Sequence, residues 1–123
     1  MANVLIDSDD ALYIVDWDTA LFAPKERDLM YAGGGQFSAK RTPQEEETLF
    51  YQGYGDTQVD PIALAYYRYE RIVQDIAAFC EQLLSTNEGG DDREQALRYL
   101  MSNFRPGNVL EIAYMSDTTQ SDA

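Results

Sequence analysis

A long amphipathic segment between Asp60 and Leu84 constrains the fold of this chain more than any other feature. Aspartate followed by proline is typical of a helix start, because aspartate caps the first turn and proline fits its first position. Apolar residues then recur at helical spacing, namely Ile62, Tyr66, Tyr69, Ile72 or Val73, Ile76, Phe79 or Cys80, and Leu83. We therefore predict a helix over about 61–85 whose aromatic residues pack in the core and do not line a ligand site.

Two short strand-like segments open the chain. "NVLID" and "ALYIVD" are rich in valine, isoleucine and leucine, and the polar "SDD" between them favours a turn. Residues 3–16 are therefore predicted to form a β-hairpin. The acidic turn lacks the glycine and the distal glutamate of an EF-hand, so we interpret it as a solvated turn and not as a calcium loop.

The remaining helices are predicted from their start and stop signals. Pro24 begins a short helix over about 24–32, which the glycines at 33–35 end. Thr42, Pro43 and Glu45 place an N-cap hydroxyl, a proline and an acid at the start of a helix over about 43–52. Two more helices are predicted over about 93–104 and 108–115, the first with Ala96, Leu97, Leu100 and Met101 facing inward.

Together these elements define a mainly α fold with a short β-hairpin, in the α+β class. We expect one domain over residues 1–115, followed by a flexible tail over 116–123. A hydrophobic content of 45% in 123 residues is sufficient for a packed core.

Charge and residue usage exclude several classes of function. Twenty-two acids against nine bases give a net charge of −13, which argues against binding to nucleic acid or anionic membranes and favours cationic ligands. We expect no signal peptide, because Met1 is followed at once by a strand-like pattern, and no apolar run approaches the roughly 20 residues of a membrane span. We therefore expect a cytoplasmic protein. With one cysteine, Cys80, and no histidine, an internal disulfide, the usual zinc sites and histidine-dependent nucleophilic catalysis are excluded.

The two ends of the predicted hairpin carry oxygen ligands. Asn3 stands at its entrance and Asp16 at its exit, and antiparallel pairing brings such ends side by side. An amide oxygen and a carboxylate suit a hard cation such as Mg²⁺, which needs only one or two protein ligands when it also binds a nucleotide. The alternative is that Asp16 simply ends a strand and caps the segment that follows.

The residues at the start of the chain also resemble a known family. "NVLID", "YIVDWD" and "ERDLM" are similar to the carboxyl-terminal lobe of the aminoglycoside phosphotransferase and choline kinase superfamily, whose fold is related to protein kinases. "DWDTALFAPKERDLM" and "YYRYERIVQDIAAF" place the nearest resemblance with spectinomycin phosphotransferase-like proteins. The resemblance covers about residues 2–104 and implies part of a kinase-like carboxyl-terminal lobe.

The resemblance implies roles for four residues. Asn3 matches the catalytic-loop asparagine and Asp16 the second magnesium-binding aspartate, so both are expected to bind Mg²⁺ and, through it, ATP. Asp28 matches an aspartate that braces the catalytic loop through backbone hydrogen bonds. Asp18 is expected only to support the metal loop.

In the family, the catalytic aspartate precedes the asparagine by five positions, which here falls before Met1. The nucleotide-binding lobe is expected to be missing as well. We therefore expect a fragment of an ATP-dependent phosphotransferase that is inactive by itself and binds Mg²⁺ and ATP weakly or not at all.

Two other interpretations stay open, namely a non-catalytic binding or regulatory module and one half of a split kinase. The resemblance implies a cationic small-molecule acceptor, such as an aminoglycoside or an aminocyclitol, in the full-length protein. Apolar surface around Val4, Leu5, Tyr13, Val15 and Trp17 is expected to be uncovered, which predicts a homodimer. The sequence does not identify the acceptor or the residues that contact it.

Overall fold

The computed structural model describes residues 3–18, 20–34, 40–85 and 89–117. It contains two strands followed by helices, which are β1 (Val4–Ile6), β2 (Leu12–Ile14), α1 (Glu26–Leu29), α2 (Pro43–Tyr54), α3 (Pro61–Ser85), α4 (Gly90–Ser102) and α5 (Val109–Ser116). The predicted fold class, mainly α with one short antiparallel hairpin, is confirmed. No helix in the described part of the chain is both long and apolar enough to cross a membrane.

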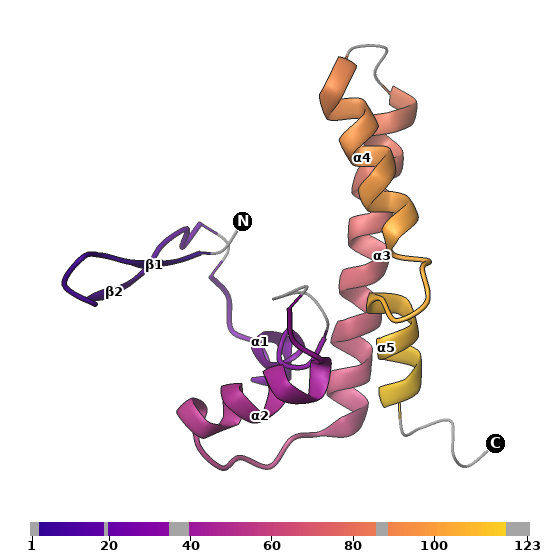
Figure 1. Ribbon diagram of the computed structural model, residues 1–123. Helices are drawn as coiled ribbons and strands as arrows, with labels where there is room; N and C mark the ends of the chain where they lie inside the picture. The colour runs from indigo at the N-terminus through magenta and orange to yellow at the C-terminus, as the bar shows by residue number, and fades with distance from the viewer. Residues whose placement is uncertain (1–2, 19, 35–39, 86–88, 118–123) are drawn as a thin grey trace.

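Helix α3 is the centre of the helical part. Its start is capped as predicted, because one carboxylate oxygen of Asp60 accepts hydrogen bonds from the N–H groups of Ile62, at 2.9 Å, and Ala63, at 3.2 Å. Helix α4 lies beside the carboxyl-terminal half of α3, and α5 lies beside its amino-terminal half (Figure 1). Helix α1 contacts α3 as well.

The buried face of α3 agrees only in part with the predicted one. Ile72 is buried as predicted, whereas Ile62 and Tyr66, which we expected to face inward, are 66% and 58% exposed. Ala65 and Arg68, which were not expected to face inward, are buried with Ile72. On α4, Ala96 is buried as predicted, whereas Leu97 and Met101 are exposed, which corrects the predicted inward face.

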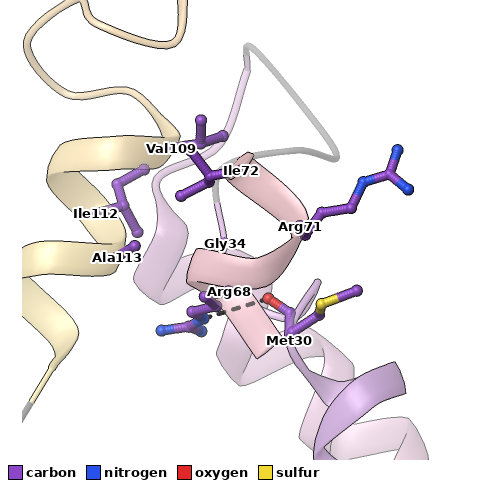
Figure 2. Close-up of a pocket in the computed structure, with 8 residues that line it drawn as sticks. All are labelled: Met30, Gly34, Arg68, Arg71, Ile72, Val109, Ile112 and Ala113. Atoms are coloured by element: carbon purple, nitrogen blue, oxygen red, sulfur yellow. Dashed lines mark hydrogen bonds between the residues drawn. The ribbon is translucent and has the colours of Figure 1, made fainter. Parts of the chain in front are cut away.

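Arg68 explains why α3 turns this face inward. Its side chain is nearly buried, with 8% exposed, and its guanidinium donates a 3.3 Å hydrogen bond to the carbonyl oxygen of Met30 (Figure 2). It also donates a 2.8 Å hydrogen bond to the carbonyl oxygen of Ala32. A third hydrogen bond, of 2.6 Å, goes to Ser116 Oγ at the end of α5. Burial lowers the pKa of the Arg68 guanidinium, and the charge of Glu47 opposes this shift. One side chain thus connects α3 to the segment after α1 and to α5.

Helix α1 has four residues, Glu26–Leu29, where the sequence predicted a helix over about 24–32. The chain turns after Leu29, so that the carbonyl groups of Met30 and Ala32 are directed to Arg68. Gly33 has φ of +67°, and a Cβ atom at Gly34 would lie 2.7 Å from the Met30 carbonyl oxygen. The turn therefore requires glycine at both positions.

The starts of α2, α4 and α5 follow local signals. Thr42 and Glu45 form the predicted capping box, in which each side chain accepts a hydrogen bond from the other residue's backbone N–H. Helix α4 begins at Gly90 and ends at Ser102, not at the predicted 93 and 104, and the acids of its first turn suit the helix dipole. Helix α5 begins after Asn108, whose side-chain oxygen accepts a hydrogen bond from the Val109 N–H.

The hairpin extends away from the helices (Figure 1). Its strands pair Val4 with Ile14, Leu5 with Tyr13 and Ile6 with Leu12. Its turn is organised by the Asp7 carboxylate, which accepts hydrogen bonds from the N–H groups of Asp9 and Ala11, both at 2.9 Å, and from the Tyr13 hydroxyl at 3.2 Å. The two backbone hydrogen bonds lower the pKa of Asp7. Hydrogen bonds of the Asp7 carboxylate thus stabilise the acidic turn from within the hairpin.

Candidate functional site

Asn3 and Asp16 lie at the open end of the hairpin. The Val15 N–H donates a 2.9 Å hydrogen bond to the Asn3 carbonyl oxygen, so the strand pairing places Asn3 opposite the residue that precedes Asp16. The side chains of Asn3 and Asp16 are both exposed. The structure therefore brings the two predicted metal ligands to the same end of the hairpin.

Asp16 has an unusual backbone conformation. Its φ is +65°, in the left-handed region that residues other than glycine rarely adopt. Among the described residues other than glycine, only Asp10, in the hairpin turn, also has a positive φ. The indole N–H of the next residue, Trp17, donates a 2.9 Å hydrogen bond to the Ile14 carbonyl oxygen. Strained residues of this kind are frequent at functional sites.

Asp18 and Asp28 have different surroundings from Asn3 and Asp16. Asp18 is exposed two residues beyond Asp16. Asp28 lies on α1, where its side chain is exposed and no described residue donates a hydrogen bond to its carboxylate. The structure does not bring Asp28 into contact with the hairpin through any of the described hydrogen bonds.

Glu26 is the buried acid of this region, and the sequence reasoning missed it. Its side chain, in a residue only 4% exposed, accepts a 3.0 Å hydrogen bond from the Asp60 N–H and forms an ion pair of 3.3 Å with Lys25. The Asp60 N–H is the main cause that lowers the pKa of Glu26. An acid in the first turn of a short helix gives no sequence signal for this contact, because its partner lies 34 positions away.

The donor set of the hairpin site fits Mg²⁺ only together with phosphate oxygens. An amide oxygen and a carboxylate are hard donors of the kind that Mg²⁺ prefers, but two side chains leave most of its octahedral positions to other ligands. In the described part of the chain no group of three or more histidine, cysteine or acidic side chains is placed to hold a metal ion. Asn3 and Asp16 therefore supply fewer ligands than Mg²⁺ needs, and the predicted metal site stays a prediction.

Apolar side chains surround this site without being covered. Val4, Leu5, Tyr13, Val15 and Trp17 are between 37% and 65% exposed, which confirms the prediction of uncovered apolar surface. Both faces of the hairpin contribute to it, because neighbouring residues in a strand point to opposite faces. Exposed apolar surface of this kind is a common feature of interaction sites and ligand-binding grooves.

The cavities of the described residues lie away from the hairpin. One of about 680 Å³ lies between α2, α3 and α5 and is lined by Glu47, Arg68 and Glu111 among others. The gap shown in Figure 2, between Met30, Arg68 and Ala113, measures about 10 Å³ and has room for at most one water molecule. None of the cavities found includes Asn3 or Asp16.

A search of solved structures identifies the fold as part of a kinase-like small-molecule phosphotransferase. The match covers 93% of this chain with a TM-score of 0.77 and 46% sequence identity. The matched protein is the spectinomycin phosphotransferase APH(9)-Ia, in a complex with ADP and spectinomycin, and this chain spans 34% of its length. The resemblance predicted from "DWDTALFAPKERDLM" and the later helix is thereby confirmed.

Two other comparisons add nothing to this identification. No protein-family profile matches the chain, and no curated protein matches it.

Proposed function

We propose that this chain is part of an ATP-dependent phosphotransferase that acts on a hydroxyl group of a cationic small molecule, of the aminoglycoside or aminocyclitol class. The observation that carries the proposal is the 46% identity to a spectinomycin phosphotransferase with ADP and spectinomycin bound. The net charge of −13 supports a cationic acceptor. Because the reaction consumes ATP, we propose the cytoplasm as its compartment.

Asn3 and Asp16 are proposed to hold the magnesium ion of the nucleotide. When bound, Mg²⁺ offsets the negative charge of the phosphate oxygens. The support from this chain is that strand pairing places both residues at one end of the hairpin and that Asp16 has a left-handed backbone conformation, which residues other than glycine rarely adopt. The two side chains would fix the position of the ion, and with it the nucleotide phosphates.

Asp28 and Asp18 are proposed to support this site without touching the nucleotide. Asp28 is exposed, and its carboxylate is available to accept backbone N–H groups of a neighbouring catalytic loop. Asp18 lies two residues from Asp16 and is proposed to order the metal loop.

We propose that the chain alone does not transfer phosphate, since it spans about a third of the matched enzyme. Weak binding of Mg²⁺ and ATP is expected for the same reason. Two alternatives are a non-catalytic binding module and one half of a split kinase. The exposed apolar faces of the hairpin favour a chain that associates with another surface, and we propose a homodimer as the simplest form of such association.

Manganese, a paramagnetic substitute for magnesium, tests the metal site directly. We expect Mn²⁺ added with ADP to broaden the amide NMR signals of Asn3 and Asp16 first, and Asp16→Asn to weaken this effect by about 10-fold or more. Asp9→Asn is the matched control, because it makes the same change of charge in the turn at the other end of the hairpin. Broadening centred on that turn, or an unchanged effect in Asp16→Asn, would contradict the assignment.

A further inference from the structure

A groove lined by aromatic side chains lies where α5 packs against α3. It measures about 460 Å³ and is formed by α3, by α5 and by the loop that joins α4 to α5. Its walls include the side chains of Tyr69, Phe104, Leu110 and Tyr114, and we call it the aromatic groove. Small-molecule sites typically measure about 300–1,000 Å³, so the aromatic groove is large enough for a small ligand.

Two of the three aromatic rings are accessible to a ligand. Phe104 and Tyr114 are 56% and 58% exposed, and neither ring contacts another aromatic ring among the described residues. Tyr69 is less exposed, and its hydroxyl donates a 3.2 Å hydrogen bond to the carboxylate of Asp117, just after α5. Aromatic rings favour stacked or edge-to-face contacts with other rings, so these walls suit a planar aromatic ligand.

Arg105 lines the same groove and has no partner in the described part of the chain. Its side chain is exposed and forms no ion pair, side-chain hydrogen bond or ring contact there. Arg71 and Arg98, by contrast, pair with acids on their own helices. The N–H groups of the Arg105 guanidinium are therefore available to an anion from solution.

The other polar side chains of the groove already have partners within the protein or carry no positive charge. The Glu111 carboxylate accepts a hydrogen bond from the Gly107 N–H. Asn103 is 8% exposed, and its amide donates hydrogen bonds to two carbonyl oxygens of α4, at 2.9 and 3.4 Å. Arg105 is the only cation that lines the groove, and a guanidinium matches the two oxygens of a carboxylate.

We propose that the aromatic groove binds a planar aromatic carboxylate, whose oxygens accept hydrogen bonds from Arg105 and whose ring stacks on Phe104 and Tyr114. The free cation is what selects an anion here, because the net charge of −13 repels anions from the rest of the chain. No hairpin residue lines the groove. The inference therefore assigns a second ligand site and does not depend on the proposed phosphotransferase function.

Titration of the full chain with naphthoate, followed by amide NMR signals, tests the inference. Signals of residues 103–105 and 110–114 are expected to shift together and to saturate. Naphthamide keeps the rings without the charge, and acetate keeps the charge without the rings. Both are expected to bind at least about 10-fold more weakly than naphthoate, because each lacks one of the two contacts.

Substitutions separate the two contacts, with the fold of each variant checked by circular dichroism. Arg105→Gln is expected to raise the dissociation constant of naphthoate about 10-fold and to leave that of naphthamide unchanged. Arg98→Gln is the matched control, because it removes the same charge outside the groove, where Arg98 pairs with Glu94. Tyr114→Leu is expected to weaken both ligands, unlike Tyr66→Leu, which changes an equally exposed tyrosine of α3 outside the groove.

Four results would each overturn the inference. They are the absence of a saturable shift with naphthoate, shifts confined to the hairpin, equal affinities for naphthoate and naphthamide, and an equal loss of affinity in the two arginine variants. The manganese experiment probes Asn3 and Asp16 at a separate place, so its result and this one are independent.

Discussion

Gly34 occupies a position where no side chain fits. A Cβ atom there would lie 2.7 Å from the carbonyl oxygen of Met30, which is also an acceptor of Arg68. An added methyl group must therefore displace the Met30 carbonyl and weaken the hydrogen bond that holds α3 against the end of α1. Position 34 requires glycine because the atom closest to it is a backbone carbonyl oxygen, which cannot move aside as the end of a side chain can.

We expect Gly34→Ala to lower the free energy of unfolding by about 1–3 kcal/mol, measured by urea denaturation. Gly53→Ala is the matched control, because Gly53 lies in α2 with nothing within 4 Å of its Cβ position. The control is expected to raise stability by about 0.5–1 kcal/mol, since alanine is the better helix former. Equal effects of the two substitutions would show that the contact with Met30 is unimportant.

At the scale of elements, Glu26 couples α1 to the start of α3. Its carboxylate accepts the Asp60 N–H, and the Asp60 side chain caps α3, so one residue supports the junction of two helices. The pKa of Glu26 is lowered in the folded chain below its ordinary value of 4.5. A carboxyl whose folded pKa is lowered stabilises the protein above its unfolded pKa, and this contribution is lost as the pH falls through the folded value.

The wild type is therefore expected to lose stability between about pH 6 and pH 3 more steeply than Glu26→Gln. The variant keeps an oxygen acceptor for the Asp60 N–H but has no charge to lose. Urea unfolding across this pH range, with the difference between wild type and variant plotted against pH, measures the effect. A constant difference over the whole range would mean that the ionisation of Glu26 does not stabilise the junction.

The elements show which parts of the fold a sequence can predict. The starts of α2 and α3 were predicted because their signals, Thr42 with Glu45 and Asp60 with Pro61, are local and act through backbone N–H groups a few residues away. The predicted inward face of α3 is right at Ile72 and wrong at Ile62 and Tyr66, which are exposed. Periodicity marks an apolar stripe, whereas the burial of Arg68 depends on carbonyl groups 36 and 38 positions away.

The candidate site likewise has features that the sequence predicts and features that it does not. Antiparallel pairing predicted that Asn3 and Asp16 lie at one end of the hairpin, because register follows from strands and turn length. The left-handed conformation of Asp16 had no sequence signal of its own. The cavity with Glu47 and Glu111 was also not predicted, since it depends on how α2 and α5 pack around α3.

At the scale of the whole molecule, the hairpin leaves its apolar side chains uncovered. Leu5 and Tyr13 pair across the strands and are both more than half exposed. A two-stranded hairpin is marginally stable alone, so burial of this surface against a second copy would stabilise it. The net charge of −13 opposes such an association, and salt screens this repulsion.

We therefore expect sedimentation to show a homodimer that becomes more stable as salt concentration rises. Leu5→Glu is expected to shift the equilibrium to monomer, because it places a charge in the apolar surface. A clean monomer at high protein concentration and high salt would rule out the proposed dimer.

The central claim, that this chain supplies the magnesium-binding part of a spectinomycin-type phosphotransferase, is tested most directly in a hybrid enzyme. Residues 3–117 of this chain replace the matched third of the spectinomycin phosphotransferase, and ATP-dependent phosphorylation of spectinomycin is measured. We predict that the hybrid is active and that Asp16→Asn lowers its rate by about 100-fold or more, with Asp9→Asn close to unchanged. A folded hybrid without activity, or one whose activity survives Asp16→Asn, would contradict the account.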